Sequence, residues 1–371
     1  MTYPIFNREQ LFVRSLDERE NKVIFERDMV SPLQEPQKFS EAGNHLIKQT
    51  VERIRKARKK KSSIMLTFGA HTIKNCMAPT LIELMKGGWV THLATNGAGI
   101  IHDWEIAYQG KTSEDVRANV DRGQFGIWEE PGFYINLAIV VGAYENLGYG
   151  ESVGKMIAQE GLEIPKISKL YQMTEKCLES DMNKAAAAID LIGVIQHFGL
   201  ETGFMPILHP FKKYSVQAQA YKLGIPFTGH PMFGHDIIYT HPINHGAAIG
   251  RTALTDFLRY AASVKNLDHG VYMSVGSAVM SPMIFEKSLS LSQNLKIQEG
   301  KHIDNHYILI VDLAESDWDW QKNGEPPINH PAYYLRYCKT FHRMGGETHY
   351  LTLDNRDFLL SLYQNLIKKN K

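Results

Sequence analysis

From residue 62 onward, short apolar runs alternate with longer segments whose apolar residues recur at helical spacing. The apolar runs have the length and boundaries of buried strands and cover 62–69, 89–96, 224–229, 270–276, 306–313 and 348–354. Helical patterns lie between or after them, at 79–88, 246–265, 282–295, 330–343 and 355–369. Short, nearly continuous apolar strands that alternate with helices are typical of a parallel sheet covered on both faces. The pattern therefore predicts a doubly wound α/β fold with a mainly parallel, six-stranded, Rossmann-like sheet.

The region 113–223 interrupts this alternation, because it contains no clear strand. Helical periodicity is visible at 129–147 and at 184–198. Thr112 and Asp115 resemble a capping box at the start of another helix. We interpret 113–223 as a helical insertion within a single α/β domain that extends over 62–371.

The first 61 residues form an N-terminal arm followed by a helix. Residues 1–35 show little periodicity, whereas Leu46, Val51 and Ile54 lie on one face of a helix expected from Phe39 to about Lys60. An arm of this kind packs either on its own body or on a neighbouring subunit. The basic run that ends the helix suits the negative end of its dipole, so we interpret it as a solvated helix end.

Composition excludes several classes of protein. The 41 Lys and Arg residues nearly balance the 40 Asp and Glu residues, so no global field would attract nucleic acid or an anionic membrane. No run of about 18 apolar residues predicts a membrane span, and the N-terminus has charges where a signal peptide is apolar. The three cysteines form no CxxC pair, which favours a reducing compartment. We expect a cytoplasmic protein that binds neither nucleic acid nor membranes.

Glycines and carboxylates recur where the expected strands end. The residues concerned are Gly69, Asn96, Gly97, Gly99, Gly276, Ser277 and Asp312. Glycine lets a backbone approach a ligand closely, and the N–H groups of a following helix can hold a phosphate. An ordinary tight turn would explain each position alone. Together they indicate a ligand site at the carboxyl ends of the strands, where open α/β sheets bind their ligands.

Two further groups of polar residues follow the expected strands. His102, Asp103 and Glu105 come directly after the NGAG turn, where the carboxylates could hold ribose hydroxyls or an ammonium group. Asp103 could instead cap the start of a helix.

The second group is richer in histidine. It contains His230, His235, Asp236, His241 and His245. Only His241 and His245 have the spacing of one helix face, so we favour polar residues that line a substrate pocket over a metal site.

Five segments of the chain resemble the deoxyhypusine synthase family, in the family's order, across residues 65–370. They are THLATNGAGIIHDWEIA, GIPFTGHPMFGHDIIY, MSVGSAVMSPMIF, ILIVDLAESD and HYLTLDNRDFLL. The first segment is also similar to the NAD-dependent ornithine-cyclising domain of bifunctional arginine-degrading proteins.

The resemblance implies an NAD site and a homotetramer with active sites at subunit interfaces. The implied NAD-binding residues are Gly69, Asn96, Gly97, Gly99, Asp103, Asp236, Gly276, Ser277 and Asp312. The family forms an enzyme–imine on a lysine of a GxSWGKI motif, and here the corresponding region, near Lys339, has no matching motif. That lysine-dependent route is therefore not expected.

These features predict an NAD-dependent enzyme that acts on an amine or amino acid through an imine, for transfer, cyclisation or deamination. His102 or His235 would be the general base, and Asp103 and Glu105, or Asp236, would hold the cationic substrate. His102, Glu105 and His235 are thus the expected catalytic group. The alternatives are a metal-dependent hydrolase that uses the 230–245 histidines and a non-catalytic nucleotide-binding protein.

Overall fold

The computed structural model describes residues 3–368, and the chain divides into two compact units. The helical unit comprises Met1–Glu26, Ile100–Ala218 and Pro231–Asp256, and the sheet unit comprises Arg27–Gly99, Gln219–His230 and Phe257–Lys371. Four helices carry the chain from one unit to the other: α1 (Phe25–Asp28), α5 (Gly97–Gln109), α11 (Val216–Leu223) and α12 (Gly246–Lys265). The expected single domain over 62–371 stays a prediction.

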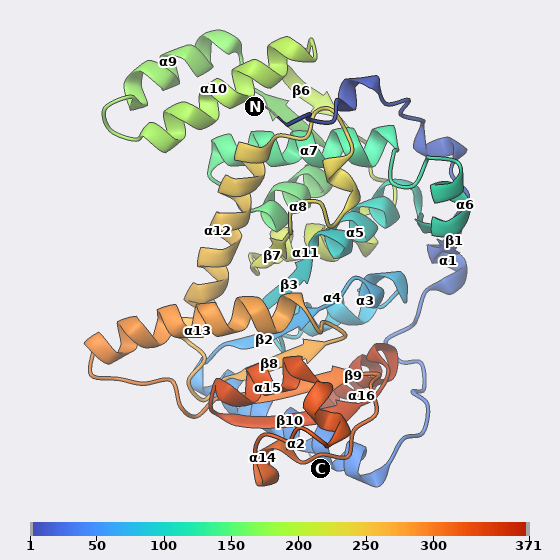
Figure 1. Cartoon of the computed structure of the whole chain (residues 1–371), viewed down its shortest axis with the longest axis vertical. Coiled ribbons are helices and arrows are strands. Elements are labelled where there is room, and N and C mark those ends of the chain that lie inside the picture. The colour runs from blue at the N-terminus through green and yellow to red at the C-terminus, as the bar shows by residue number, and fades with distance from the viewer. Residues whose placement is uncertain (1–2, 369–371) are drawn as a thin grey trace. The chain divides into compact units, whose positions relative to one another are not determined.

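The sheet unit contains six parallel strands, which confirms the predicted doubly wound α/β architecture (Figure 1). Across the sheet they are β10 (Glu347–Thr352), β9 (Tyr307–Asp312), β8 (Val271–Val275), β2 (Ile64–Phe68), β3 (His92–Asn96) and β7 (Phe227–His230). Numbered along the chain among these six, the order is the 3-2-1-4-5-6 of dinucleotide-binding folds, read from β7. The strand order therefore reverses between β2 and β8, which is where such folds bind their ligand.

Helices cover both faces of this sheet. On one face, α16 (Asn355–Ile367) contacts both α2 (Glu41–Lys60) and α4 (Ala78–Lys86). The second half of α12, α13 (Met280–Gln298) and α15 (Arg336–Arg343) lie on the other. The helix expected over 330–343 is divided into a 3-10 turn at Pro331–Tyr334 and α15.

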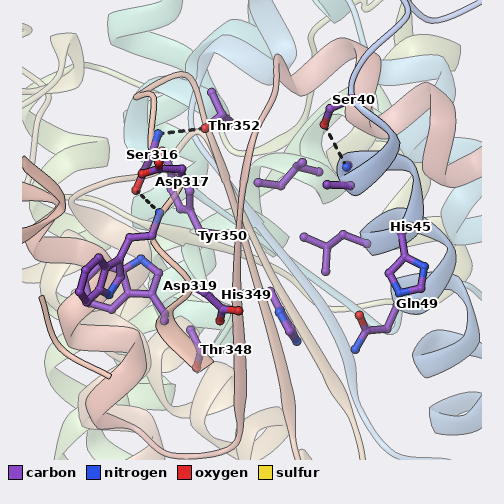
Figure 2. A pocket seen from close by; sticks show the side chains of 16 residues that line it. Ser40, His45, Gln49, Ser316, Asp317, Asp319, Thr348, His349, Tyr350 and Thr352 are labelled. Atoms are coloured by element: carbon purple, nitrogen blue, oxygen red, sulfur yellow. Dashed lines mark hydrogen bonds between the residues drawn. The ribbon is translucent and has the colours of Figure 1, made fainter. Parts of the chain in front are cut away.

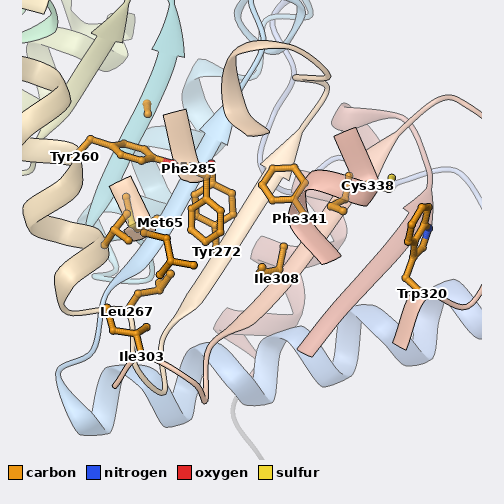
Figure 3. Close-up of a cluster of buried hydrophobic side chains, with 14 of the residues drawn as sticks. Met65, Tyr260, Leu267, Tyr272, Phe285, Ile303, Ile308, Trp320, Cys338 and Phe341 are labelled. Carbon is orange, nitrogen blue, oxygen red and sulfur yellow. Dashed lines mark hydrogen bonds between the residues drawn. The ribbon is translucent and has the colours of Figure 1, made fainter. Parts of the chain in front are cut away.

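A buried cluster joins the second face of the sheet to its helices (Figure 3). Met65 and Ile308 of the strands pack with Phe285 of α13 and Phe341 of α15. The cluster also contains the hydroxyl of Tyr272, which accepts a hydrogen bond from Tyr260 at 2.7 Å. Because these phenols bond each other, their polar tips are accommodated inside an apolar core.

The helical unit is built mainly on α7 (Glu129–Glu145), α8 (Tyr149–Gln159), α9 (Ile167–Cys177) and α10 (Met182–His197). Two short antiparallel pairs complete it, β1 (Asn21–Ile24) with β4 (Lys111–Glu114) and β5 (Gly161–Ile164) with β6 (Gly203–Pro206). The expectation that 113–223 has no strand is therefore wrong. Each of these strands has only four residues, and β5 and β6 begin with glycine, so no alternation is long enough to recognise.

The N-terminal arm packs on its own chain, one of the two arrangements expected for it. Besides the β1–β4 pairing, the Arg8 guanidinium donates to the carbonyl oxygen of Tyr239 at 2.8 Å. The predicted capping box is wrong, because Thr112 lies in β4 and Asp115 alone caps α6 (Val116–Asp121) by accepting from Ala118 N at 3.0 Å.

Shorter elements connect the main ones. They are α1 (Phe25–Asp28), α3 (His71–Lys74), α14 (Trp320–Asn323) and the 3-10 turns Arg8–Gln10, Leu16–Glu18, Lys212–Tyr214 and Ile237–Tyr239. Between residues 3 and 368, no helix combines the length and apolar character that crossing a membrane requires.

Candidate dinucleotide site

The carboxyl ends of the six strands align in one row across the sheet unit. Phe68 pairs with Thr95 on one side and with Val275 on the other, and the ladder continues by one residue because Gly69 N donates to Val275 O at 3.1 Å. Gly276 N likewise donates to Val311 O at 2.9 Å. The resulting carboxyl-end row is Thr352, Asp312, Gly276, Gly69, Asn96 and His230. Four of its members are residues that the sequence predicts for the cofactor site.

Two glycines occupy the centre of the row, where the strand order reverses. A Cβ on Gly69 would lie 2.1 Å from the carbonyl oxygen of Gly276, so only glycine permits this approach. Gly276 has a φ of +57°, and a Cβ built on it would meet no atom within 4 Å. The backbone here therefore has no side chains and is accessible on one side, as dinucleotide binding requires.

Asn96 and the glycines after it begin α5. The side-chain oxygen of Asn96 accepts a hydrogen bond from Gly99 N at 2.9 Å, which caps the helix. A Cβ on Gly99 would lie 2.2 Å from Thr95 Oγ1. Gly99 therefore has a packing role in holding α5 against β3, while the Asn96 amide N–H groups remain donors at the row.

Ser277 and Asp312 flank the other half of the row. Ser277 Oγ accepts from Ser281 N at 3.2 Å, at the start of α13. Asp312 Oδ1 accepts from Leu313 N at 2.8 Å, and its Oδ2 accepts no hydrogen bond from any described residue. A hydroxyl donor and a carboxylate acceptor are therefore present beside the open backbone of Gly276.

His230 and Thr352 are the members of the row that the dinucleotide interpretation missed, and His230 has the more unusual surroundings. Its Nε2 shares a hydrogen bond with Thr228 Oγ1 at 2.9 Å, and His92 Nε2 lies 3.0 Å from the same hydroxyl. Burial lowers the pKa of both imidazoles to about 3, so both are neutral at pH 7. Only the pairing of β7 with β3, which places His230 opposite Asn96, could have revealed it.

Asp103 lies in the helical unit and is fully buried. Its carboxylate accepts hydrogen bonds from Ser215 Oγ at 2.6 Å, Val216 N at 2.8 Å and both nitrogens of Gln217 at 3.2 and 3.0 Å. Burial raises the pKa of Asp103, and these hydrogen bonds offset part of that rise. The carboxylate thus caps the start of α11 with both oxygens occupied, and its predicted contact with the cofactor is untested.

His102 and Glu105 belong to a hydrogen-bonded chain in the same unit. Arg19 of the arm donates to Glu105 Oε1 at 2.7 Å, Thr112 Oγ1 donates to Glu105 Oε2, and His102 Nδ1 lies 2.7 Å from Thr112 Oγ1. Because the single hydroxyl proton of Thr112 goes to Glu105, His102 must donate from Nδ1. Its Nε2 therefore carries the lone pair, as a general base requires.

The charge of Glu105 is stabilised in spite of its burial. Burial by itself raises the pKa of Glu105, but Arg19 and the hydrogen bonds lower it by more. The net result is a pKa of about 2. Glu105 is therefore ionised at neutral pH and fixes the tautomer of His102 through Thr112.

His235 and Asp236 lie next to each other in the helical unit but differ in environment. The His235 side chain is exposed, whereas Asp236 is largely buried and accepts a hydrogen bond from Ile238 N at 3.2 Å. Burial raises the pKa of Asp236 to about 6. A carboxyl group that titrates near neutrality is more common at functional sites than elsewhere.

The other histidines of 230–245 do not converge. His241 Nε2 lies 3.3 Å from Glu129 Oε2, and His245 accepts from Ala248 N at the start of α12. The expectation that His241 and His245 share a helix face is wrong, since α12 begins at Gly246. Within residues 3–368 no three His, Cys, Asp or Glu side chains are grouped so that they could hold a metal ion.

No protein-family model matches the sequence, and no curated protein matches it either. Solved structures with a similar arrangement include ArgZ, an arginine dihydrolase of the ornithine–ammonia cycle in cyanobacteria, at 14% identity and a TM-score of 0.40 over 87% of this chain and 32% of ArgZ. AgrE in complex with ornithine and NAD+ has 16% identity and a TM-score of 0.43, over 89% of this chain and 34% of AgrE. A conserved LOR/SDH protein from Methanococcus maripaludis S2 has 11% identity and a TM-score of 0.41, over 91% of this chain and 72% of its own. The chain therefore spans about a third of the length of ArgZ and of AgrE.

Proposed function

We propose that the carboxyl-end row binds a nicotinamide dinucleotide and that the protein is an NAD-dependent enzyme acting on an amine or amino acid. The observation that carries the proposal is the meeting of Gly69 and Gly276 where the strand order reverses, with open space above Gly276. In doubly wound sheets, bare backbone at this point receives the pyrophosphate of a dinucleotide.

The side chains along the row suit the remaining parts of such a ligand. Asn96 offers amide donors, Ser277 a hydroxyl, and Asp312 a carboxylate oxygen that can accept from ribose hydroxyls. Bound NAD would supply a hydride acceptor for the carbon that bears the substrate nitrogen. The amine class of the substrate rests on the sequence resemblance to deoxyhypusine synthase.

Oxidation of an amine to an imine also releases a proton from nitrogen. The sequence puts His102 forward as its acceptor, and within the helical unit Thr112 and Glu105 leave the lone pair on Nε2. Glu105 is then a positioning residue, and Asp236 is the proposed partner of the substrate ammonium. His235 is the alternative base.

Calorimetric titration of NAD into protein stripped of bound ligand tests the cofactor site. Asn tolerates a positive φ, so Gly276→Asn should fold, while its side chain fills the space proposed for the dinucleotide. Gly300→Asn is the matched control, since Gly300 has a φ of +67° and is equally open but lies at the end of α13. We expect Gly276→Asn to weaken NAD binding by at least about tenfold and Gly300→Asn to leave it unchanged.

Two results would contradict the cofactor proposal: no heat from wild-type protein with either NAD or NADP, or equal effects of the two variants. Turnover is tested separately, by following NAD reduction with a panel of amines that includes ornithine. Loss of turnover in His102→Gln with unchanged NAD affinity would support the assigned base. Tight NAD binding without turnover of any amine would leave a nucleotide-binding protein that is not this enzyme.

A further inference from the structure

A groove of about 590 Å³ runs along the free edge of the sheet, and it is separate from the carboxyl-end row except at Thr352 (Figure 2). Its floor is β10, the outermost strand. One wall is the beginning of α2, and the other is the segment Ser316–Trp320. We call this feature the edge groove.

The two walls rise on opposite faces of the sheet. Gln49 of α2 donates to Glu347 at 2.6 Å, so the odd-numbered side chains of β10 face α2. On the other face, Ser316 N donates to Thr352 Oγ1 at 3.3 Å, and Tyr350 bonds the carbonyl oxygen of Ala314 at 2.5 Å. The edge of the sheet therefore lies between two overhanging walls, which is the space that one additional strand would occupy.

The backbone of β10 has hydrogen-bonding groups directed into this space. Glu347 N donates to the carbonyl oxygen of His306, just before β9, and Leu353 N to that of Asp312, so the amides of the even-numbered residues point away from β9. The amide of Thr348 is already bonded to the side chain of Gln321 at 3.0 Å. Tyr350 and Thr352 therefore present their N–H and C=O groups to the groove, as an unpaired edge does.

The walls differ in chemistry, which specifies the side chains of an occupant. Asp317 and Asp319 lie on the loop wall beside Trp318, and neither forms an ion pair with any residue between 3 and 368. The α2 wall contributes Ala42, Gly43 and Leu46 beside the polar Ser40, His45 and Gln49. In an added strand, successive side chains point to opposite faces, so cationic side chains would meet the acidic wall while apolar ones meet α2.

We propose that the edge groove binds an extended segment of a partner protein in which basic and apolar residues alternate. The segment pairs with Tyr350 and Thr352 as a seventh strand, the mode known as β-augmentation. Main-chain hydrogen bonds provide affinity, and Asp317 with Trp318 selects lysine or arginine. The edge groove shares only Thr352 with the carboxyl-end row.

The test uses a short, capped peptide of alternating valine and lysine, titrated into the full chain. Hydrogen exchange at the Tyr350 and Thr352 amides should slow when the peptide is bound. Two control peptides are expected to bind at least about tenfold more weakly: one with glutamate in place of lysine, and one with N-methyl groups on the pairing amides. Absence of binding at millimolar concentration, or equal binding of all three peptides, would overturn the proposal.

A charge reversal in the protein makes the test specific. Asp317→Lys should weaken binding of the lysine peptide by about tenfold and strengthen binding of the glutamate peptide. Asp121→Lys, at an exposed acid of α6, is the matched control and should change neither. If the lysine peptide instead dissociates a dimer in light scattering, the groove holds a second copy of this chain, and the proposed partner is wrong.

Discussion

Asp103 is the residue at which the expected and observed environments differ most. It accepts four hydrogen bonds at the start of α11, whereas the amide oxygen of an asparagine can replace only part of them. We expect Asp103→Asn to lower the free energy of unfolding by roughly 1.5–3 kcal/mol, measured by denaturant titration. Asp121→Asn, at an exposed position, should change it by less than about 0.5 kcal/mol. Unchanged stability together with weaker NAD binding would instead identify Asp103 as a ligand-binding residue.

Glu105 links stability to pH. Its pKa falls from 4.5 in the unfolded chain to about 2 in the folded protein, so its ionised form stabilises the fold at every pH above about 4.5. That contribution, on the order of 3 kcal/mol, is lost as the pH falls from about 4.5 to about 2. The difference in unfolding free energy between wild type and Glu105→Gln should therefore shrink across this range. A difference that stays constant would show that Arg19 does not stabilise the charge.

At the scale of the element, the N-terminal arm is held to α5 by a buried ion pair. Arg19 and Glu105 have almost no exposed side-chain surface, whereas Arg14 and Glu18 of the same arm form an exposed pair at 3.7 Å. Arg19→Met leaves a buried carboxylate without its cation and should cost about 3–5 kcal/mol. Arg14→Met should cost less than about 1 kcal/mol.

The double variant Arg19→Met with Glu105→Gln separates charge from packing. Since it removes both charges, we expect it to be more stable than Arg19→Met alone in urea denaturation. Equal costs for Arg19→Met and Arg14→Met would mean that the buried pair does not hold the arm.

At the scale of the whole molecule, the sequence resemblance predicts a homotetramer. The arm packs on its own helical unit, so it offers no independent support for an exchanged arm between subunits. Closed symmetry is nonetheless the usual outcome for soluble oligomers. Light scattering at micromolar concentration should give four times the mass of one chain, and the mass of a single chain would refute the prediction.

The sequence by itself determined the sheet. All six strands overlap the predicted runs, and β2, β8 and β9 do so because a central strand buried on both faces needs a continuous apolar run. It also placed Gly69, Asn96, Gly276 and Asp312 at strand ends, since glycine and polar residues interrupt such runs. The short strands β5 and β6 escaped detection, because four residues provide no measurable period.

Only the tertiary structure decided which of those strand ends lie together. The order of the strands brings Gly69 against Gly276 and places His230 opposite Asn96, although more than one hundred residues separate each pair along the chain. It also separated residues that are adjacent in sequence. Asp103 faces α11, while His102 and Glu105 face Thr112 and the arm, because neighbouring positions on a helix point in different directions and different partners pack against each face.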